Sequence, residues 1–170
     1  LFKILPFIPE CSRIVEPFAG SAAVSMGAIL NRRTNYAWIN DINKPLMSLW
    51  ERIVNSPEQL ADVYERLWIE QESDPKEFFK YIRTQFNQSG DPDLLLYLLA
   101  RCVKGAVRYN SKGEFSQSSD NRRLGRNPKV MRKDIVATSQ IMNGRVLITS
   151  LNYRDVLLRA TEEDIVYLDP

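Results

Sequence analysis

Two apolar segments on either side of a glycine turn constrain the fold of this chain more than any other feature. Residues 13–18 have the composition of a short buried strand, Gly20 and Ser21 form a turn, and residues 22–30 suit a helix. A second apolar strand over residues 36–39 ends abruptly at a polar Asn-Asp pair. This strand–turn–helix–strand order begins a doubly wound α/β domain, in which ligands bind at the carboxyl ends of the strands.

The region after the second strand is helical. No glycine occurs between Gly27 and Gly90. Ser56, Asp74 and Asp91 are residues that we expect to cap helices, and each stands before a proline that suits the first turn. A loop rich in Gly, Ser, Asn and Arg then spans residues 104–128. We expect helices around this loop at residues 45–54, 57–70, 75–87, 92–103 and 129–142.

The sheet resumes near the carboxyl end. Residues 145–149 and 165–168 have the pattern of strands, and residues 153–159 have that of a short helix between them. The helical block is therefore an insertion, which divides the chain into residues 1–43 with 144–170 and an inserted region, residues 44–143. Because Leu1 to Ile8 has the pattern of a helix already under way and a short open sheet leaves an edge uncovered, we expect a portion of a longer protein, truncated at both ends.

Composition excludes several kinds of chemistry. The chain has no histidine, which excludes Ser-His-Asp hydrolysis and histidine-ligated zinc. The two cysteines, Cys11 and Cys102, form no CxxC pair, so we expect no metal site and a reducing environment. No apolar run approaches the length of a membrane span and no signal peptide is recognisable, so we expect a soluble intracellular protein without membrane contact.

Positive charge is concentrated in one segment. Residues 101–133 contain ten Lys or Arg residues against two acids, although the formal net charge of the whole chain is only +2. Segregation of this kind is typical of a surface that binds a polyanion. The alternative is a solvated basic face without a ligand.

Three carboxylates follow the expected strands. Glu16, Asp41 and Asp169 each stand at the carboxyl end of a strand, and in a parallel sheet these ends converge on one edge beside the Gly20 turn. A carboxylate after the second strand can accept hydrogen bonds from ribose hydroxyls. Together, the three carboxylates and the glycine turn predict a cofactor that contains a nucleoside. The chain has neither a GxGxxG fingerprint nor a GxxxxGK[ST] loop, so the sequence gives no indication of NAD or ATP.

Four segments in order resemble one enzyme family. They are Glu16-Pro-Phe-Ala-Gly20, Asn40-Asp41-Ile-Asn43, Arg108-Tyr-Asn-Ser-Lys-Gly-Glu-Phe115 and Tyr167-Leu-Asp-Pro170. Together they resemble the S-adenosylmethionine-dependent, Dam-type (D12 class) DNA adenine N6-methyltransferases across nearly the whole chain. The resemblance implies a Rossmann-like methyltransferase sheet with an inserted helical DNA-recognition subdomain. Residues 1–43 and 144–170 would then form the S-adenosylmethionine-binding catalytic domain, and residues 44–143 the target-recognition region.

The resemblance also implies roles for individual residues. Asp169 and the carbonyl of Pro170 would accept hydrogen bonds from the exocyclic amine of a flipped adenine. The cofactor site would comprise Glu16, Pro17, Phe18, Gly20, Ser21, Asp41, Ile42, Asn152, Tyr153 and Asp169. Double-stranded DNA would contact Arg108, Tyr109, Asn110, Lys112, Arg122, Arg123, Arg126, Lys129 and Lys133.

Other functions stay open from the sequence alone. The same exocyclic amine chemistry serves N4-cytosine methylation, although a serine usually replaces the acid at the position of Asp169. A catalytically inactive DNA-binding module that retains the cofactor fold is the second alternative. The resemblance places the protein in the cytoplasm of a prokaryote or phage-infected cell, associated with the nucleoid, with a restriction endonuclease as a conceivable partner.

Overall fold

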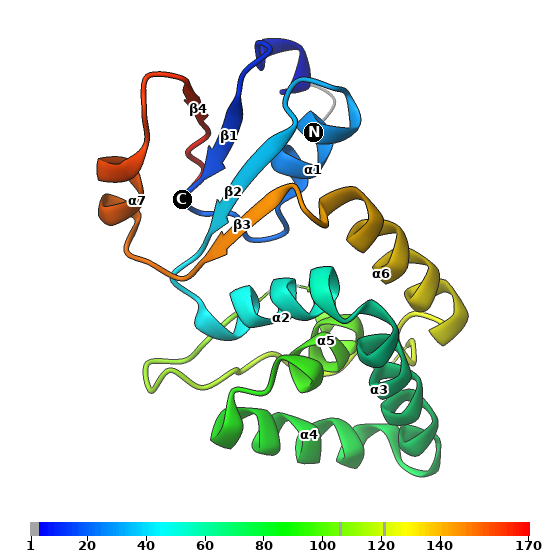
Figure 1. Ribbon diagram of the computed structural model, residues 1–170. Coiled ribbons are helices and arrows are strands. Elements are labelled where there is room, and N and C mark those ends of the chain that lie inside the picture. Colours follow the sequence, from blue (N-terminus) through cyan, green and yellow to red (C-terminus); the bar gives the residue numbers. More distant parts are fainter. Residues whose placement is uncertain (1–3, 106, 121) are drawn as a thin grey trace. The chain divides into compact units, whose positions relative to one another are not determined.

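A parallel sheet organises the first part of the computed structural model, which describes residues 4–105, 107–120 and 122–170. Its strands are β1 (Arg13–Glu16), β2 (Tyr36–Asn40), β3 (Val146–Thr149) and β4 (Asp164–Val166). They lie in the order β3-β2-β1-β4, and every neighbouring pair is parallel (Figure 1). The chain thus runs outward from β1 through β2 to β3 and then returns to the other side of β1, which confirms the expected Rossmann-like α/β class.

β1, β3 and β4 are shorter than the sequence predicts, whereas β2 extends one residue further, to Asn40. β1 ends at Glu16 because Pro17 has no amide hydrogen to continue the ladder. β4 ends at Val166, although the amide of Tyr167 still donates to the carbonyl of Val15 at 2.9 Å. The acidic and glycine-containing segments therefore begin directly where regular pairing stops.

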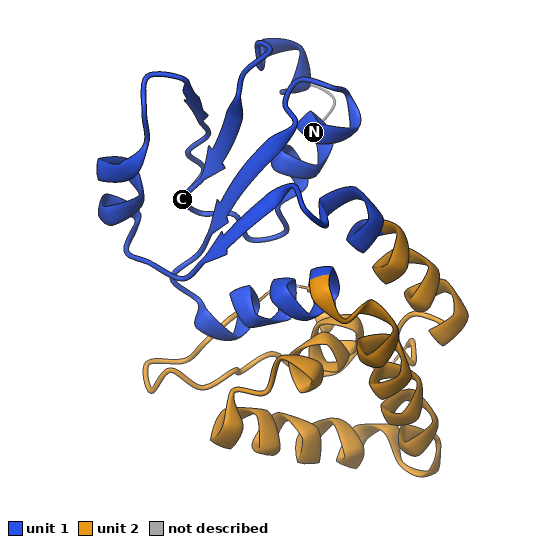
Figure 2. Cartoon of the chain, in the orientation of Figure 1, with its two compact units in different colours: residues 1–54, 138–170 blue, residues 55–137 orange. Residues whose placement is uncertain are grey.

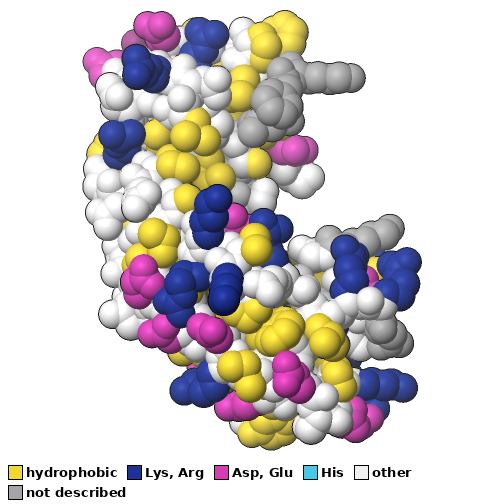
Figure 3. All heavy atoms as spheres, turned by 90° about the vertical axis from the view of Figure 1, so that its right-hand side faces the viewer, with side chains coloured by type: hydrophobic (Ala, Val, Ile, Leu, Met, Phe, Trp, Pro, Cys, Tyr) yellow, Lys and Arg dark blue, Asp and Glu magenta, His cyan; other side chains and the backbone are white. Residues whose placement is uncertain are grey.

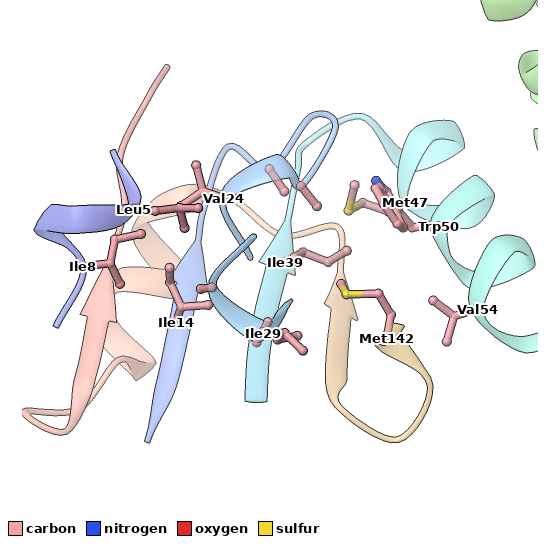
Figure 4. Close-up of a cluster of buried hydrophobic side chains, with 14 residues drawn as sticks. Leu5, Ile8, Ile14, Val24, Ile29, Ile39, Met47, Trp50, Val54 and Met142 are labelled. Atoms are coloured by element: carbon pink, nitrogen blue, oxygen red, sulfur yellow. The ribbon is translucent and has the colours of Figure 1, made fainter. Parts of the chain in front are cut away.

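Each face of the sheet packs against a different helix. On one face, Ile14 and Ile39 contact the buried side of α1 (Ala23–Leu30) in a cluster that includes Val24 and Ile29 (Figure 4). On the other face, Val15 and Trp38 pack against Val156 of α7 (Tyr153–Arg159). Burial of one such aliphatic side chain stabilises the fold by about 1.5–3 kcal/mol.

Parts of two longer helices complete the first core. Met47, Trp50 and Val54 of α2 (Lys44–Asn55) join the cluster around α1, together with Met142 at the end of α6 (Pro128–Met142) (Figure 4). Ser139 fastens the two helices to each other, because its hydroxyl donates to the carbonyl of Val54 at 2.8 Å.

The chain divides into two compact units (Figure 2). Unit 1 comprises residues 1–54 and 138–170, and unit 2 comprises residues 55–137. Unit 1 takes in more of α2 and α6 than the boundaries expected from the sequence, because the apolar sides of both helices belong to its core.

Unit 2 is a helical bundle with a long irregular segment. Its helices are α3 (Pro57–Glu70), α4 (Pro75–Ser89), α5 (Pro92–Arg101) and the first part of α6, with short 3₁₀ turns η2 (Gln71–Ser73) and η3 (Val103–Gly105). Its core holds aromatic and aliphatic side chains that are almost completely buried: Leu60, Tyr64, Phe79, Leu95, Tyr97, Leu98 and Phe115.

Two of the three expected helix caps are present. The carboxylates of Asp74 and Asp91 accept hydrogen bonds from the amides of Glu77 and Asp93, at 3.1 and 2.9 Å. The expected capping role of Ser56 is wrong, since its side chain makes no cap bond although α3 begins at Pro57. Proline at the first position suffices there because the amide that it lacks has no partner inside a helix.

The expected helix over Leu1 to Ile8 is also wrong within the described residues. Residues 1–3 lie outside them, and Leu5–Phe7 forms a single 3₁₀ turn, η1. Ile8 is extended and Pro9 follows, so the helix cannot continue. The apolar pattern reflects burial of Leu5 and Ile8 against the core instead.

A partly buried ion pair attaches the edge strand β4 to β1. The guanidinium of Arg13 donates from Nε and Nη2 to both carboxylate oxygens of Asp164, at 2.8 and 2.7 Å. The bond from Arg13 holds the pKa of Asp164 below its usual value. The start of the strand that leads to Asp169 is thereby fixed in register with β1.

Candidate functional site

The glycine turn after β1 is held by bonds from two neighbouring elements. The amide of Gly20 donates to Asp41 Oδ2 at 3.2 Å, and its carbonyl accepts from the indole of Trp50 at 3.0 Å. Gly20 has a φ of +50°, and no atom lies within 4 Å of the position that a Cβ would occupy. The turn therefore leaves its backbone open to a ligand on that side.

Glu16 caps the helix that follows this turn. Its side chain is only 3% exposed, and its Oε2 accepts from the amide of Ser25 at 2.7 Å. Helix α1 needs this bond because Ala22, which precedes it in a left-handed conformation, makes no side-chain cap bond. Burial raises the pKa of Glu16, and the bonds from Ser25 and Val24 oppose that rise.

Asp41 lies at the end of β2 with both carboxylate oxygens already oriented. Oδ2 accepts from Gly20, and Oδ1 accepts from the amide of Asn43 at 3.0 Å. The carboxylate is partly exposed, and each of its oxygens retains a lone pair for another donor. Beside it, the side chain of Ile42 is 71% exposed.

A small cavity lies where the strand order reverses. It encloses about 210 Å³ between the carboxyl ends of β1 and β4. Its lining contains Glu16, Phe18, Ser21 and Asp169 from the expected cofactor and catalytic sets, and also Tyr167. The crevice outside a switch point of a parallel sheet is the usual ligand site of open α/β folds.

The two expected catalytic residues follow β4, and Asp169 lines this cavity. Asp169 and Pro170 are both exposed. The hydroxyl of Tyr167 donates to Asp169 Oδ2 at 3.4 Å. Loss of solvation raises the pKa of this tyrosine, and the carboxylates of Asp169 and Glu16 add to the rise. Asp169 therefore has free acceptor capacity toward a ligand.

Asn152 and Tyr153 lie at the start of α7. The ring of Tyr153 contacts that of Phe18, with ring centroids 5.2 Å apart. The amide oxygen of Asn152 accepts from the backbone amide of Arg154 at 3.0 Å and so caps α7. This capping role was not expected, and it leaves one lone pair on that oxygen for a ligand.

Asn40 is a buried residue of this edge that the site prediction missed. Its Oδ1 accepts from Leu151 N and Thr149 Oγ1, both at 2.8 Å. Its Nδ2 donates to the carbonyls of Pro17 and Leu151, at 3.0 and 3.1 Å. One side chain at the end of β2 thus joins the segment after β1 to the end of β3 and the segment that follows it. Its place in the Asn40-Asp41 pair was the only signal in the sequence.

The first expected DNA-binding segment forms a short hairpin in unit 2. Tyr109 and Phe115 pair as an antiparallel bridge, and the side chain of Asn110 accepts from the amides of Lys112 and Glu114 at the turn. Phe115 is anchored by Asn87 of α4, whose amide bonds both its N–H and its carbonyl. Arg108, Asn110 and Lys112 are exposed at the tip and along the arms.

The second expected segment shows more charge pairing than the sequence suggests. Arg122 and Arg123 both bond the carboxylate of Asp120, at 3.3 and 3.0 Å, and Arg126 pairs with Asp134. Arg132 is held on α6 by three acids of α3, and Arg101 is buried. On the face drawn in Figure 3, basic and acidic side chains are correspondingly interspersed. Lys129 and Lys133 are exposed on α6.

We expect the bonds around Asp120 to persist well into the acid range. The amide of Arg122 and the guanidiniums of Arg122 and Arg123 lower the pKa of this carboxyl to about 2. An unfolded aspartate titrates near pKa ~3.9, so the ionised carboxylate stabilises the folded state above pH ~4, and this stabilisation is lost as the pH falls from about 4 toward 2. Carbon NMR of the Asp120 carboxyl, recorded over a range of pH, should give a titration midpoint near the pKa of about 2. A midpoint at the unfolded value would contradict the geometry, and Asp120→Asn should mimic the acid form at neutral pH.

Two further structural findings bear on the class of site. Within the described ranges, no group of three or more His, Cys, Asp and Glu side chains could hold a metal ion. None of the helices that the structure describes is long and apolar enough to cross a bilayer.

A parallel α/β unit with carboxylates at three strand ends, a cavity at its switch point and a helical insertion is typical of the Rossmann-like class of fold. The comparison with known families is more specific. The chain belongs to the D12 class N6 adenine-specific DNA methyltransferases, whose family model matches residues 1–170.

Named relatives agree with this family. The chain is 27% identical over 167 residues to the DNA adenine methylase of Vibrio cholerae and 26% identical over 167 residues to that of Escherichia coli K12; 96% of this chain is covered in both. It is 25% identical over 175 residues to the DNA N-6-adenine-methyltransferase of Escherichia phage P1, with the whole chain covered. The chain spans 57% of the length of the two bacterial relatives and 22% of the phage protein.

Proposed function

We propose that the protein transfers a methyl group from S-adenosylmethionine to the N6 amine of adenine at a specific site in duplex DNA. The observation that supports this most is the cavity at the switch point, where Glu16, Phe18 and Asp169 meet. The family to which the chain belongs acts on this amine. The proposal also places the protein in the cytoplasm of a bacterial or phage-infected cell, since these relatives are bacterial and phage proteins.

The residues of this edge suit S-adenosylmethionine. The two Asp41 oxygens are fixed by Gly20 and Asn43 and match the two hydroxyls of a ribose. The exposed Ile42 offers an apolar surface for the adenine ring. The open backbone at Gly20 and the cavity beside Phe18 suit the methionine end. Pro17, Ser21, Asn152 and Tyr153 complete the proposed cofactor set.

The target amine would be held by Asp169 and by the carbonyl of Pro170. Its lone pair is delocalised into the adenine ring, so the amine is a poor nucleophile. Two acceptors bonded to its hydrogens favour a tetrahedral nitrogen, which localises that lone pair. When bound, S-adenosylmethionine supplies a methyl group activated by the positive sulfonium. Because positioning and electrostatics suffice for this reaction, it needs no histidine.

DNA would bind the hairpin and the cations of unit 2. A base in a duplex must be flipped out to reach the Asp169 edge, at a cost of a few kcal/mol. We assign Arg108, Tyr109, Asn110 and Lys112 of the hairpin to DNA contact. Arg122, Arg123 and Arg126 are assigned to base edges, and Lys129 and Lys133 to phosphates.

Sequencing of methylated bases tests the function directly. DNA exposed to the natural full-length protein and S-adenosylmethionine should acquire N6-methyladenine within one short sequence. Methylation of cytosine instead would favour the N4-cytosine alternative, and DNA binding without any methyl transfer would favour an inactive DNA-binding module. If the protein belongs to a restriction–modification system, the methylated site should be protected from the partner endonuclease.

We expect Asp41→Ala to weaken S-adenosylmethionine binding about 5- to 150-fold, which corresponds to roughly 1–3 kcal/mol, because the ribose hydroxyls lose their acceptor. Calorimetry of cofactor binding measures this. Since Asp41 also bonds Gly20, Asp41→Asn serves as a matched variant that retains one acceptor and should lose less affinity. Unchanged affinity in a folded Asp41→Ala protein would show that the ribose binds elsewhere.

A further inference from the structure

We propose that three buried side chains, Tyr64, Gln71 and Arg101, are positioning residues for DNA sequence choice, because they hold the backbone of the loop that carries Arg122, Arg123 and Arg126. Residues 122–126 are called the arginine loop below. The inference rests on the proposed function, since it concerns how that function selects its DNA. None of the three positioning residues was expected from the sequence to contribute to the site.

The arginine loop is held by its carbonyl groups. Tyr64 of α3 donates its hydroxyl to the carbonyl of Arg126 at 2.7 Å. Gln71 of η2 donates Nε2 to the carbonyl of Leu124 at 2.9 Å. Arg101 at the end of α5 donates Nη1 to the carbonyl of Arg123, and to that of Asp120 at 3.0 Å. Three separate elements of the bundle therefore hold successive parts of one short loop.

The holding groups are deeply buried and linked to one another. Tyr64, Gln71 and Arg101 are 1%, 0% and 2% exposed. The hydroxyl of Tyr97, also fully buried, donates to Gln71 Oε1 at 3.0 Å and so fixes the direction of its amide. Burial raises the pKa of Tyr64 to about 12, so its hydroxyl stays a donor at neutral pH. A buried donor that loses its acceptor destabilises the folded protein. The conformation of the arginine loop and the packing of the helical core therefore stabilise each other.

Gly125 allows the loop to lie directly on these groups. Its φ is +91°, and a Cβ there would lie 3.1 Å from Arg101 Cδ and 3.2 Å from the Tyr64 hydroxyl. A larger residue would therefore press on two of the three holding side chains. The close approach and the carbonyl bonds are parts of the same arrangement.

The outward side of the loop presents guanidinium groups. The side chains of Arg122, Arg123 and Arg126 are 81%, 73% and 53% exposed. Asp120, 6% exposed, bonds the first two and limits their rotation. Arginine reads guanine through two parallel hydrogen bonds, which require an accurately placed backbone. A loop fixed before binding loses less entropy on binding and penalises a wrong base more strongly.

The test compares Tyr64→Phe with a control that destabilises the same bundle elsewhere. Tyr64→Phe removes only the hydroxyl that bonds Arg126. Ile82→Val, at a 3% exposed position of α4, removes one core methylene and none of these bonds. Gln71→Met is a second variant, which removes the bond to Leu124 and also the acceptor of the Tyr97 hydroxyl. Amide hydrogen exchange of residues 122–127 reports the loop, and binding to cognate and single-base-substituted duplexes reports sequence choice.

We expect Tyr64→Phe and Gln71→Met each to speed exchange of the loop at least tenfold and to reduce the ratio of cognate to substituted affinity at least fivefold. Binding to unrelated DNA at low salt should stay within twofold, and Ile82→Val should change neither readout. Faster exchange with an unchanged affinity ratio would overturn the positioning role, as would equal effects in Ile82→Val. Hydrogen exchange and DNA binding are measured without methyl transfer. If the wild-type protein discriminates between duplexes but does not methylate them, the proposed enzymatic function is refuted. The two variants still test the positioning role in that case. A wild-type protein that binds all duplexes equally well would overturn the positioning role.

Discussion

Methyl transfer by the natural full-length protein should fall at least about 10²- to 10³-fold when Asp169 is replaced by alanine, while cofactor and DNA affinities stay within a few-fold. The carboxylate lies exposed at the switch-point cavity, with only a long bond to Tyr167, and its proposed partner is the reacting amine itself. Its contribution is therefore made to the transition state more than to binding. Single-turnover rates with saturating DNA and S-adenosylmethionine measure the loss.

Two variants sharpen this test. Asp169→Asn keeps one acceptor oxygen in place and should be less impaired than alanine. Glu163→Ala removes an exposed carboxylate just before β4, away from the cavity, and should leave the rate unchanged. A rate within a few-fold of wild type in Asp169→Ala would mean that Asp169 is only a solvated acid at a strand end.

The second large effect is expected on stability. Asn40→Ala should lower the free energy of unfolding by about 3–4 kcal/mol, because it removes four hydrogen bonds to partners after β1 and at the end of β3. Urea unfolding, with the slope of the transition unchanged, measures this difference. The same change should also weaken cofactor binding, since Pro17 precedes Phe18 and Gly20, and Leu151 precedes Asn152.

Asn31→Ala is the matched control for this experiment. Asn31 also donates an amide hydrogen to a carbonyl, that of Gly27, but it is exposed and makes a single such bond. We expect a loss of about 1 kcal/mol or less there. Asn40→Asp should be nearly as damaging as alanine, because its second oxygen would face the carbonyls of Pro17 and Leu151. A loss below about 1 kcal/mol for Asn40→Ala would contradict the proposed role of the network.

Local signals in the sequence determined the elements of this protein. The prolines after Ser56, Asp74 and Asp91 marked the first residues of three helices, and the apolar runs around Gly20 marked two strands. The same reasoning failed at Leu1 to Ile8, because an apolar pattern reports burial without distinguishing a helix from a single 3₁₀ turn. Helix starts and turns depend on residues a few positions apart, so they can be predicted from the sequence without knowledge of the tertiary structure.

The tertiary structure alone decided how those elements combine into sites. Glu16 and Asp169 meet across one cavity because β4 lies beside β1, an adjacency that no local pattern contains. Asn40 reaches Leu151, far along the chain, and the carbonyls of the arginine loop reach buried donors on α3, η2 and α5. The sequence showed Arg132 only as one more positive charge of the basic segment, whereas folding brings Glu58, Asp62 and Glu65 of α3 to it. The physical reason is that hydrogen bonds and ion pairs between distant residues depend on burial and register, and these exist only once the chain has packed.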